Sequence, residues 1–359
     1  MIIGLYHPRA LSGDGGITRS VRALSTALAG RGHDARVIYA GAAPPPDRDS
    51  WRGVRHAGMG RLEIPIALDD AIGEVDVLVL HSAWVSYNIA AARVAMRYGI
   101  PYVLAPRGAY EPRIRRRRPL AKWIWWHLFE KELVERAAAI HVFFESQSRQ
   151  IRSLGYEGPL IVAPNGVTVP EQLAWDGGSS GRLVYVGRFD MEHTGLGVLL
   201  EGLRLLPVGA RPRLILAGPD WMGGKRQTMT RVEQLDLGRW VEIRPAIYGR
   251  EKFELMASAK GFLYPSLFEA FGNSAAEAAS LGVPVLTGTY PLGRYLAERD
   301  AGIAVDGEPE AIAEGLAELQ GSSASRLGAN ARDAMTPFTW DSVAEAWASQ
   351  LPSSATQRA

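Results

Sequence analysis

The chain has 359 residues, 47% of them apolar and 22% charged, with a formal charge of +2 and no cysteine. This composition excludes a strongly basic nucleic-acid-binding protein, a disulfide-rich domain and a thiolate zinc site, and it suits a reducing compartment such as the cytoplasm. No run of 18 apolar residues predicts a membrane span, and the length predicts two domains.

The chain is expected to begin with a strand, a glycine-rich loop and a helix. Residues 1–6 are an apolar run without the basic flank of a signal peptide, and they predict a buried strand. The loop ends in Gly15 and Gly16, and a helix with one apolar face follows, so the chain opens with a βαβ unit. The loop is not a dinucleotide-binding fingerprint, because Thr18 stands in place of the third glycine. The two glycines either let the backbone approach a ligand closely or form a plain flexible turn.

An Asp-x-Asp pattern, formed by Asp47 and Asp49, lies in a proline-rich loop. Two such carboxylates can hold a metal-bound diphosphate, but a metal site needs its ligands at a rigid strand end. Three prolines directly before Asp47 indicate a surface loop, and we therefore expect no metal site there.

Two polar side chains follow predicted strands in the first half of the chain. Residues 75–80 form an almost continuous apolar run, typical of a strand in a parallel sheet, and His81 follows it directly. Residues 101–104 predict a further strand, and Arg107 lies in the turn after it. Ligands of open α/β sheets bind at such carboxyl ends, so both side chains are candidates for a site. The alternative for His81 is that it merely closes its strand.

Arginine fills residues 113–118 except at Ile114, and Pro119 then opens a tryptophan-rich helix expected to end near Ala138. Arginines beside tryptophans are typical of membrane contact, since indoles sit at headgroup level and guanidinium groups meet lipid phosphate. The alternative is a solvated basic loop with the tryptophans in the core, and apolar residues all around the helix support partial burial. The composition would also suit nucleic acid, but no readout motif accompanies it. The residues assigned to acceptor or membrane contact are Arg107, Arg115, Arg116, Arg117, Lys122, Trp123 and Trp126.

A segment without periodic apolar residues divides the chain. It covers residues 167–181, and the alternation of strands and helices restarts after it. We expect an N-terminal domain over residues 1–169, a second domain over residues 170–336, and a crossover helix with a polar tail over residues 337–359.

In the second half, residues 183–186 predict a strand, and Arg188 lies just after its carboxyl end. A guanidinium there suits a diphosphate, because it pairs with phosphate through two parallel hydrogen bonds. The alternative is a surface salt bridge.

Residues 263–284 combine a strand, a turn and an alanine-rich helix that carry two glutamates, Glu269 in the turn and Glu277 on the helix. The amides of residues 272–274 are expected at the helix N-terminus, which attracts phosphate. Carboxylates that bind hydroxyls, beside amides that bind a diphosphate, suggest a nucleotide-sugar site. The alternative is a capping box, in which Ser274 and Glu277 only stabilise the start of the helix.

Taken together, these motifs resemble the family 4 glycosyltransferases over nearly the whole chain. Segments 80–84 and 105–112, with the basic tryptophan helix, are similar to the bacterial polysaccharide and glycolipid branch. The motifs that carry the resemblance are Gly15-Gly16, residues 164–167, Gly187-Arg188, Glu269 and Glu277 around residues 271–273, and residues 282–284.

The resemblance implies an α/β protein with two Rossmann-like βαβ domains facing across a cleft, the GT-B fold, whose C-terminal helix packs back on the N-terminal domain. It implies transfer of a hexosyl unit, with retention of configuration and no essential metal, from a UDP- or GDP-linked sugar to a hydroxyl acceptor. The acceptor would be a glycan or a lipid-linked glycan, met in the cytoplasm or at the inner face of the cytoplasmic membrane.

The resemblance also implies roles for single residues. His81 and Glu269 would be catalytic, the histidine lying against the transferred sugar and the glutamate contacting its hydroxyls. Glu277 would bind the ribose hydroxyls. The remaining residues implied in donor binding are Gly15, Gly16, Arg188, Phe271, Gly272, Asn273 and Ser274.

One position departs from the family pattern. A lysine is expected six residues after Arg188, and Thr194 stands there. A charge-assisted hydrogen bond contributes about 1.5–3 kcal/mol, so its loss would slow the reaction about 10- to 100-fold unless Lys225 or Arg226 replaced it. The alternative function is a nucleotide-sugar-binding pseudoenzyme that acts as a partner subunit.

Overall fold

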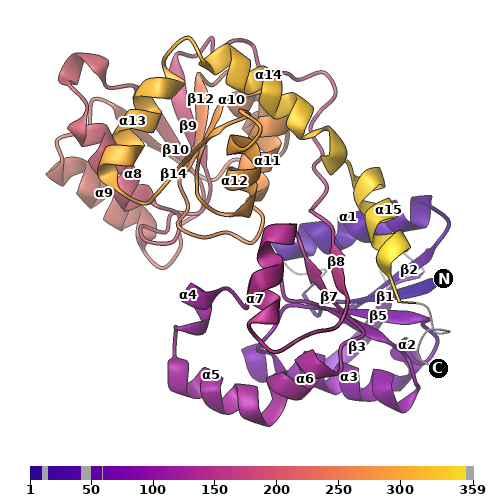
Figure 1. Ribbon diagram of the computed structural model, residues 1–359. Helices are drawn as coiled ribbons and strands as arrows, with labels where there is room; N and C mark the ends of the chain where they lie inside the picture. Colours follow the sequence, from indigo (N-terminus) through magenta and orange to yellow (C-terminus); the bar gives the residue numbers. More distant parts are fainter. Residues whose placement is uncertain (10–14, 42–49, 59, 353–359) are drawn as a thin grey trace. The chain divides into compact units, whose positions relative to one another are not determined.

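The computed structural model describes residues 1–9, 15–41, 50–58 and 60–352. The chain forms two compact units, an N-terminal unit of Met1–Gly166 with Trp340–Ala359 and a C-terminal unit of Val167–Thr339 (Figure 1). The end of the chain therefore belongs to the first unit. Asp47 and Asp49 lie outside the described residues.

The N-terminal unit is built on an eight-stranded sheet with the order β4-β3-β2-β1-β5-β6-β7-β8. Its strands are β1 (Ile2–Tyr6), β2 (Asp34–Ala40), β3 (Arg52–Ala57), β4 (Ile64–Ile66), β5 (Val77–His81), β6 (Tyr102–Ala105), β7 (Ala139–Val142) and β8 (Leu160–Val162). Neighbouring strands run parallel, except for the antiparallel pair β3 and β4. All residues of β5, β6 and β7 are buried, as their apolar runs predict for strands covered on both faces.

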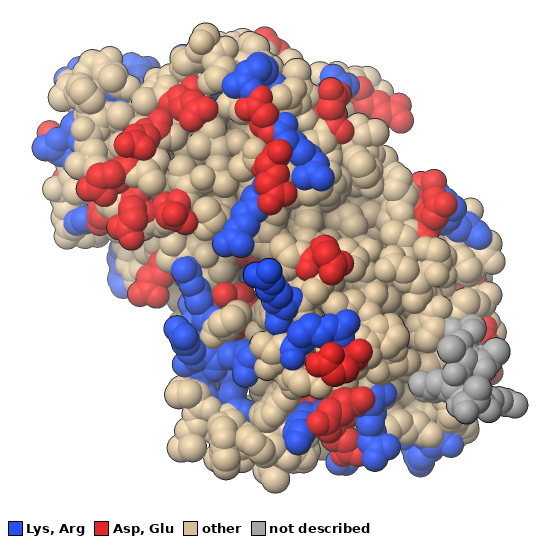
Figure 2. Space-filling view, viewed as in Figure 1, with Lys and Arg blue, Asp and Glu red and all other residues tan. Residues whose placement is uncertain are grey.

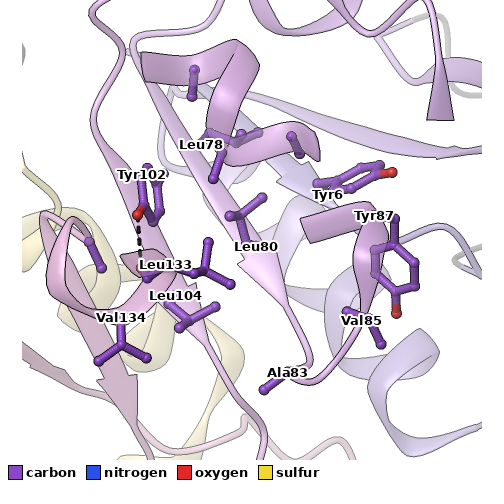
Figure 3. Close-up of a cluster of buried hydrophobic side chains, with 14 of the residues drawn as sticks. Tyr6, Leu78, Leu80, Ala83, Val85, Tyr87, Tyr102, Leu104, Leu133 and Val134 are labelled. Atoms are coloured by element: carbon purple, nitrogen blue, oxygen red, sulfur yellow. Dashed lines mark hydrogen bonds between the residues drawn. The ribbon is translucent and has the colours of Figure 1, made fainter. Parts of the chain in front are cut away.

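Helices cover both faces of this sheet. They are α1 (Gly16–Gly30), η1 (Gly60–Leu62), α2 (Asp69–Ile72), α3 (Ser86–Arg97), α4 (Pro112–Arg115), α5 (Pro119–Trp125), η2 (Trp126–Glu130), α6 (Lys131–Glu135), η3 (Glu145–Gln147), α7 (Ser148–Arg152) and α15 (Trp340–Gln350). One buried cluster joins the sheet to α3 and α6; Figure 3 shows part of it, where the Tyr102 hydroxyl donates to the Leu133 carbonyl at 2.8 Å. The other cluster joins α1 to Val343 and Trp347 of α15. The predicted packing of the C-terminal helix on the N-terminal domain is confirmed.

The tryptophan-rich helix is present, but its predicted end near Ala138 is wrong. Helix α5, the π-helical turn η2 and α6 follow one another and stop at Glu135. The backbone N–H of Ala138 already donates to the Tyr102 carbonyl of β6, at 2.9 Å. Ala138, which apolar periodicity assigned to the helix, is therefore hydrogen-bonded to the sheet instead.

The C-terminal unit is built on a six-stranded, wholly parallel sheet with the order β11-β10-β9-β12-β13-β14. Its strands are β9 (Arg182–Val186), β10 (Arg213–Ala217), β11 (Val241–Arg244), β12 (Gly261–Tyr264), β13 (Val285–Gly288) and β14 (Ile303–Val305). Its helices are α8 (Leu196–Leu205), η4 (Val208–Ala210), α9 (Gly224–Gln234), α10 (Gly249–Ala257), α11 (Asn273–Ser280), α12 (Pro291–Ala297), α13 (Pro309–Leu319), α14 (Ala324–Ala334) and η5 (Thr336–Phe338). Both units are α/β with mainly parallel sheets, as predicted.

Each sheet has a point where the strand order reverses. In the C-terminal unit, β9 lies between β10 and β12, and in the N-terminal unit β1 lies between β2 and β5. Ligands of open α/β sheets bind outside the carboxyl ends of the strands at such points. The loops after β9 and β12, and after β1 and β5, are therefore where a site is expected.

Candidate functional site

Three predicted residues lie around the switch point of the C-terminal sheet. Arg188 comes two residues after β9, and Glu269 lies in the loop between β12 and α11. Glu277 lies on α11 itself. Because β9 and β12 are neighbours in the sheet, their loops emerge side by side, so Arg188 and Glu269 lie at the same edge of the sheet although they are distant in sequence.

The carboxylate of Glu269 is held by one of its two oxygens. Its Oε1 accepts from the hydroxyls of Ser266, at 3.1 Å, and Tyr264, at 3.3 Å. The same oxygen lies 3.4 Å from Nε2 of His193. Within the described residues Oε2 has no hydrogen-bond partner, so it is the oxygen that can accept from a ligand hydroxyl.

Glu277 forms a partly buried ion pair. Its Oε1 accepts from Nζ of Lys252 on α10 at 2.8 Å, and the two side chains are 16% and 8% exposed. The alternative of a capping box is wrong, because the N-cap of α11 is Gly272 and no side chain caps the helix. Ser274 lies inside the first turn, where it cannot serve as the cap. Glu277 is thus fixed by α10 and not by its own helix start.

The start of α11 is set by backbone conformation. Gly272 has a φ of +97°, in the left-handed region, and a Cβ there would lie 2.7 Å from the ring of Tyr290. Only glycine fits both the conformation and the space, and it turns the chain so that Asn273 and Ser274 form the first turn. Phe271 is 3% exposed and packs on Phe338, with ring centroids 6.1 Å apart. Its side chain belongs to the core, so a contact with a ligand would have to use its backbone.

Arg188 has no carboxylate within ion-pair distance among the described residues, so the salt-bridge alternative is wrong. Its guanidinium lies 5.1 Å from the ring centroid of Trp221.

Thr194 is fully buried, and its hydroxyl donates to the Asp190 carbonyl at 2.6 Å, so it offers no charge to a ligand. Nζ of Lys225, in the first turn of α9, lies 6.0 Å from the ring of Phe189, the residue after Arg188. Lys225 is therefore a second cation beside the β9 loop.

The N-terminal sheet brings two histidines together at its switch point. His7 directly follows β1 and His81 ends β5, with ring centroids 6.4 Å apart. Burial is the main cause that lowers the pKa of His7 to about 4, and Arg107 adds to it. Burial, Arg107, His7 and His141 lower the pKa of His81 well below its usual value. Both rings are therefore neutral at physiological pH.

Arg107 lies in this cluster. Its Nε donates to Nδ1 of His81 at 3.2 Å, and its Nη1 donates to Oδ1 of Asn165 at 3.0 Å. The guanidinium also lies 5.2 Å from the ring centroid of Phe143, and burial lowers its pKa to about 9. Sequence reasoning assigned Arg107 to an acceptor or membrane surface, whereas the structure joins it to His81.

Gly15 is the N-cap of α1 and Gly16 its first residue. Among the described residues no atom lies within 4 Å of a Cβ built on Gly15, so their contacts do not require glycine there.

The basic tryptophan segment is exposed in part. Figure 2 shows Lys and Arg side chains gathered over α4 and the start of α5. Its exposed apolar side chains, 44% to 71% accessible, are Leu120, Trp123, Ile124 and Leu128. Arg116 and Arg117 are exposed and Arg115 is partly so. In the described residues no helix is long and apolar enough to cross a bilayer.

Other residues of this segment pack inward, as the alternative expected. Trp126 packs on Trp84, with ring centroids 6.2 Å apart, and Nζ of Lys122 lies 5.5 Å from the Trp84 ring. The buried carboxylate of Glu130 accepts from the Trp84 backbone N–H, the Tyr110 hydroxyl and the Trp125 indole, at 2.8 to 3.0 Å. Burial raises the pKa of Glu130. This buried network ties the segment to the loop after His81.

Sequence reasoning missed His7, His141, Asn165 and Lys252. His7 follows the first predicted strand just as His81 follows its own, so the same rule could have found it. Lys252 gave no signal, because its partner Glu277 lies 25 positions away.

Comparison with known proteins gives two domain matches, a glycosyl transferase 4-like domain over residues 15–166 and a glycosyl transferases group 1 domain over residues 180–321. A curated relative is the GDP-mannose:cellobiosyl-diphosphopolyprenol alpha-mannosyltransferase of Xanthomonas oryzae pv. oryzae. It is 24% identical over 261 residues, which are 71% of this chain and 67% of the relative.

Solved structures match nearly the whole chain. The sucrose-phosphate synthase of Thermosynechococcus elongatus has a TM-score of 0.76 at 18% identity and is matched over 97% of each chain. HepE of Anabaena, solved with UDP and glucose, has a TM-score of 0.73 at 16% identity, over 97% of this chain and 98% of its own. At these identities the likeness shows a shared fold.

Proposed function

Because the chain belongs to the family 4-like glycosyltransferases of the GT-B fold, we propose that it moves a hexosyl unit from a nucleoside diphosphate sugar to a hydroxyl acceptor. The observation that carries this proposal is the set of groups at the C-terminal switch point. Two carboxylates, each with one oxygen already engaged, stand beside a helix N-terminus and an arginine without an ion-pair partner among the described residues.

The donor is proposed to lie along this set. Arg188 and the amides of the first turn of α11 would bind the diphosphate, since guanidinium groups and helix N-termini both favour phosphate. Glu277 would accept from the ribose hydroxyls and Glu269 from those of the sugar. Lys225 would supply the positive charge that Thr194 does not, because it lies beside the same loop.

Departure of the diphosphate is the difficult step, and charge that stabilises the leaving group is the largest catalytic contribution. In the proposed mechanism Arg188 and the helix N-terminus provide that charge without a metal. The acceptor hydroxyl attacks from the side that the diphosphate leaves, and a phosphate oxygen takes its proton. The anomeric configuration is then retained, which the NMR signal of the product's anomeric proton would test.

The acceptor is proposed to be lipid-linked and met at an anionic membrane surface. Exposed Trp123 with Leu120 and Leu128 can enter the headgroup region, while the arginines before them meet lipid phosphate. The relative from Xanthomonas oryzae is named for a diphosphopolyprenol acceptor.

A thermal-shift screen tests the donor assignment. With UDP-, GDP-, ADP- and dTDP-sugars all at one concentration, a donor present at 100 times its Kd would stabilise the folded protein by about 2.7 kcal/mol and raise the melting temperature by several degrees. The sugar that does so names the base, and radiolabelled transfer with it onto a lipid extract tests the reaction. No shift with any of the four would contradict the donor site.

A vesicle experiment tests the membrane assignment. Replacing Arg115, Arg116 and Arg117 by alanine is expected to weaken binding to anionic vesicles about 100-fold, since each basic residue near the surface contributes about 1 kcal/mol. The control replaces the exposed Arg204, Arg213 and Arg239 of the C-terminal unit, which changes the net charge equally. Equal binding by both variants would refute the assignment.

A further inference from the structure

The contact between Arg107 and His81 determines which ring nitrogen of the histidine carries its proton. Arg107 Nε lies 3.2 Å from His81 Nδ1. A guanidinium has only N–H donors, so Nδ1 must be the acceptor and cannot hold a proton. In a neutral imidazole the proton is then on Nε2.

We propose that Arg107 is a positioning residue that fixes His81 as the neutral Nε2–H tautomer, and thereby makes His81 a hydrogen-bond donor to a substrate oxygen at the carboxyl end of β5. This rests on the proposed function and goes beyond it, because it assigns a role to Arg107 and states which way the hydrogen bond of His81 runs. A histidine held in this form cannot take a proton at Nδ1 and does not act as a base there.

The free nitrogen of His81 is available for such a bond. His81 is fully buried, and within the described residues its Nε2 has no hydrogen-bond partner. Buried donors are nearly always paired, because an unpaired one is costly. A ligand oxygen at Nε2 would supply the missing acceptor.

The backbone around His81 is held rigidly. The Asn88 side-chain amide donates to the carbonyls of His81, at 3.1 Å, and Ser82, at 3.0 Å. Ser82 has a φ of +78°, a conformation that non-glycine residues adopt at a cost. These contacts therefore fix the backbone that carries His81 at the carboxyl end of β5.

Arg107 is held in a similar way. Its own φ is +52°, again in the left-handed region. Asn165, which is 5% exposed, accepts from Nη1, and the ring of Phe143 lies beside the guanidinium. Backbone strain that is maintained by several contacts is common where a side chain must be aimed. Here the contacts direct Nε at His81.

The charges around His81 agree with a neutral donor. The titratable groups that face it are Arg107, His7 and His141, and none of them is an acid. Burial is the largest cause that lowers the pKa of His81, and Arg107 is the next. The ring therefore stays neutral across the physiological range.

Nitrogen NMR of the full-length protein tests the tautomer directly. The His81 signals are assigned by their loss in His81→Gln. In the wild type we expect an unprotonated Nδ1 and a protonated Nε2 at pH 7. The Arg107→Met variant should show a mixture of tautomers, and Arg107→Lys, which restores a donor, should return the wild-type pattern. A protonated Nδ1 in the wild type, or an unchanged tautomer in Arg107→Met, would overturn the proposal.

Activity provides the second measurement. Arg107→Met should lower kcat for transfer roughly 10-fold, while the Kd for the nucleoside diphosphate stays the same, and Arg107→Lys should recover part of the loss. An unchanged kcat would contradict the positioning role. If the wild type transfers no sugar, the proposed function fails, but the NMR spectrum still decides the tautomer.

Discussion

Replacing Arg188 by alanine is expected to lower kcat for sugar transfer by about 100- to 1,000-fold, with little change in the melting temperature. Preorganised positive charge at a developing anion is worth about this much when one group is removed. Stability should hold because the guanidinium of Arg188 forms no ion pair among the described residues and lies beside the ring of Trp221. The measurement is single-turnover transfer from the donor that the thermal-shift screen identifies.

Two further variants make this result specific. Arg188→Lys keeps the charge but loses the paired hydrogen bonds, so it should recover only part of the rate. Arg213→Ala removes an exposed arginine from the start of β10, at the far end of a neighbouring strand, and should leave kcat unchanged. If Arg188→Ala turned over like the wild type, the diphosphate would have to bind elsewhere and the donor site would be wrong.

Much of the fold could be predicted because its signals are local. Apolar runs such as β5 are buried on both faces, and this distinguishes a parallel sheet from an alternating antiparallel one. Once the sheets are parallel, their carboxyl ends become the places for ligands, and that rule predicted that His81 and Arg188 lie at such ends, where the structure has them. Local sequence and one general rule about sheets were sufficient to place these two residues.

The structure corrected the prediction where distant residues compete with a local pattern. Ser274 and Glu277 have the spacing of a capping box, but the left-handed Gly272 starts the helix two residues before Ser274. The carboxylate of Glu277 instead accepts a hydrogen bond from Lys252 of another helix. No spacing rule within one helix could have predicted this partner.

In the tryptophan segment, too, contacts with distant residues decide between structures that the local sequence leaves open. Its sequence fits both a membrane surface and a buried helix, and the structure exposes Trp123 but packs Trp126 on Trp84. The choice between them depends on Glu130, whose carboxylate is bonded inside the unit to Trp84, Tyr110 and Trp125. The hydrogen bonds of this buried acid thus hold the inner side of the segment against the N-terminal unit.

Replacing Lys252 by methionine is expected to destabilise the C-terminal unit by about 1–3 kcal/mol, because it leaves the partly buried carboxylate of Glu277 without its partner. Unfolding should begin around α10 and α11, which the pair joins. Hydrogen exchange of the α11 amides reports this region apart from the rest of the chain, and thermal unfolding reports the whole.

The double variant Lys252→Met with Glu277→Leu separates the stability of this pair from its part in donor binding. Replacing an ion pair by apolar groups of similar volume often costs little folding stability or even adds some. The double variant should therefore recover most of the exchange protection. It should still fail to bind the nucleoside diphosphate in calorimetry, because no carboxylate remains for the ribose hydroxyls. Wild-type affinity in the double variant would mean that Glu277 only holds α11 to α10. Affinity lost without recovery of protection would mean instead that the pair is needed to form the first turn of α11.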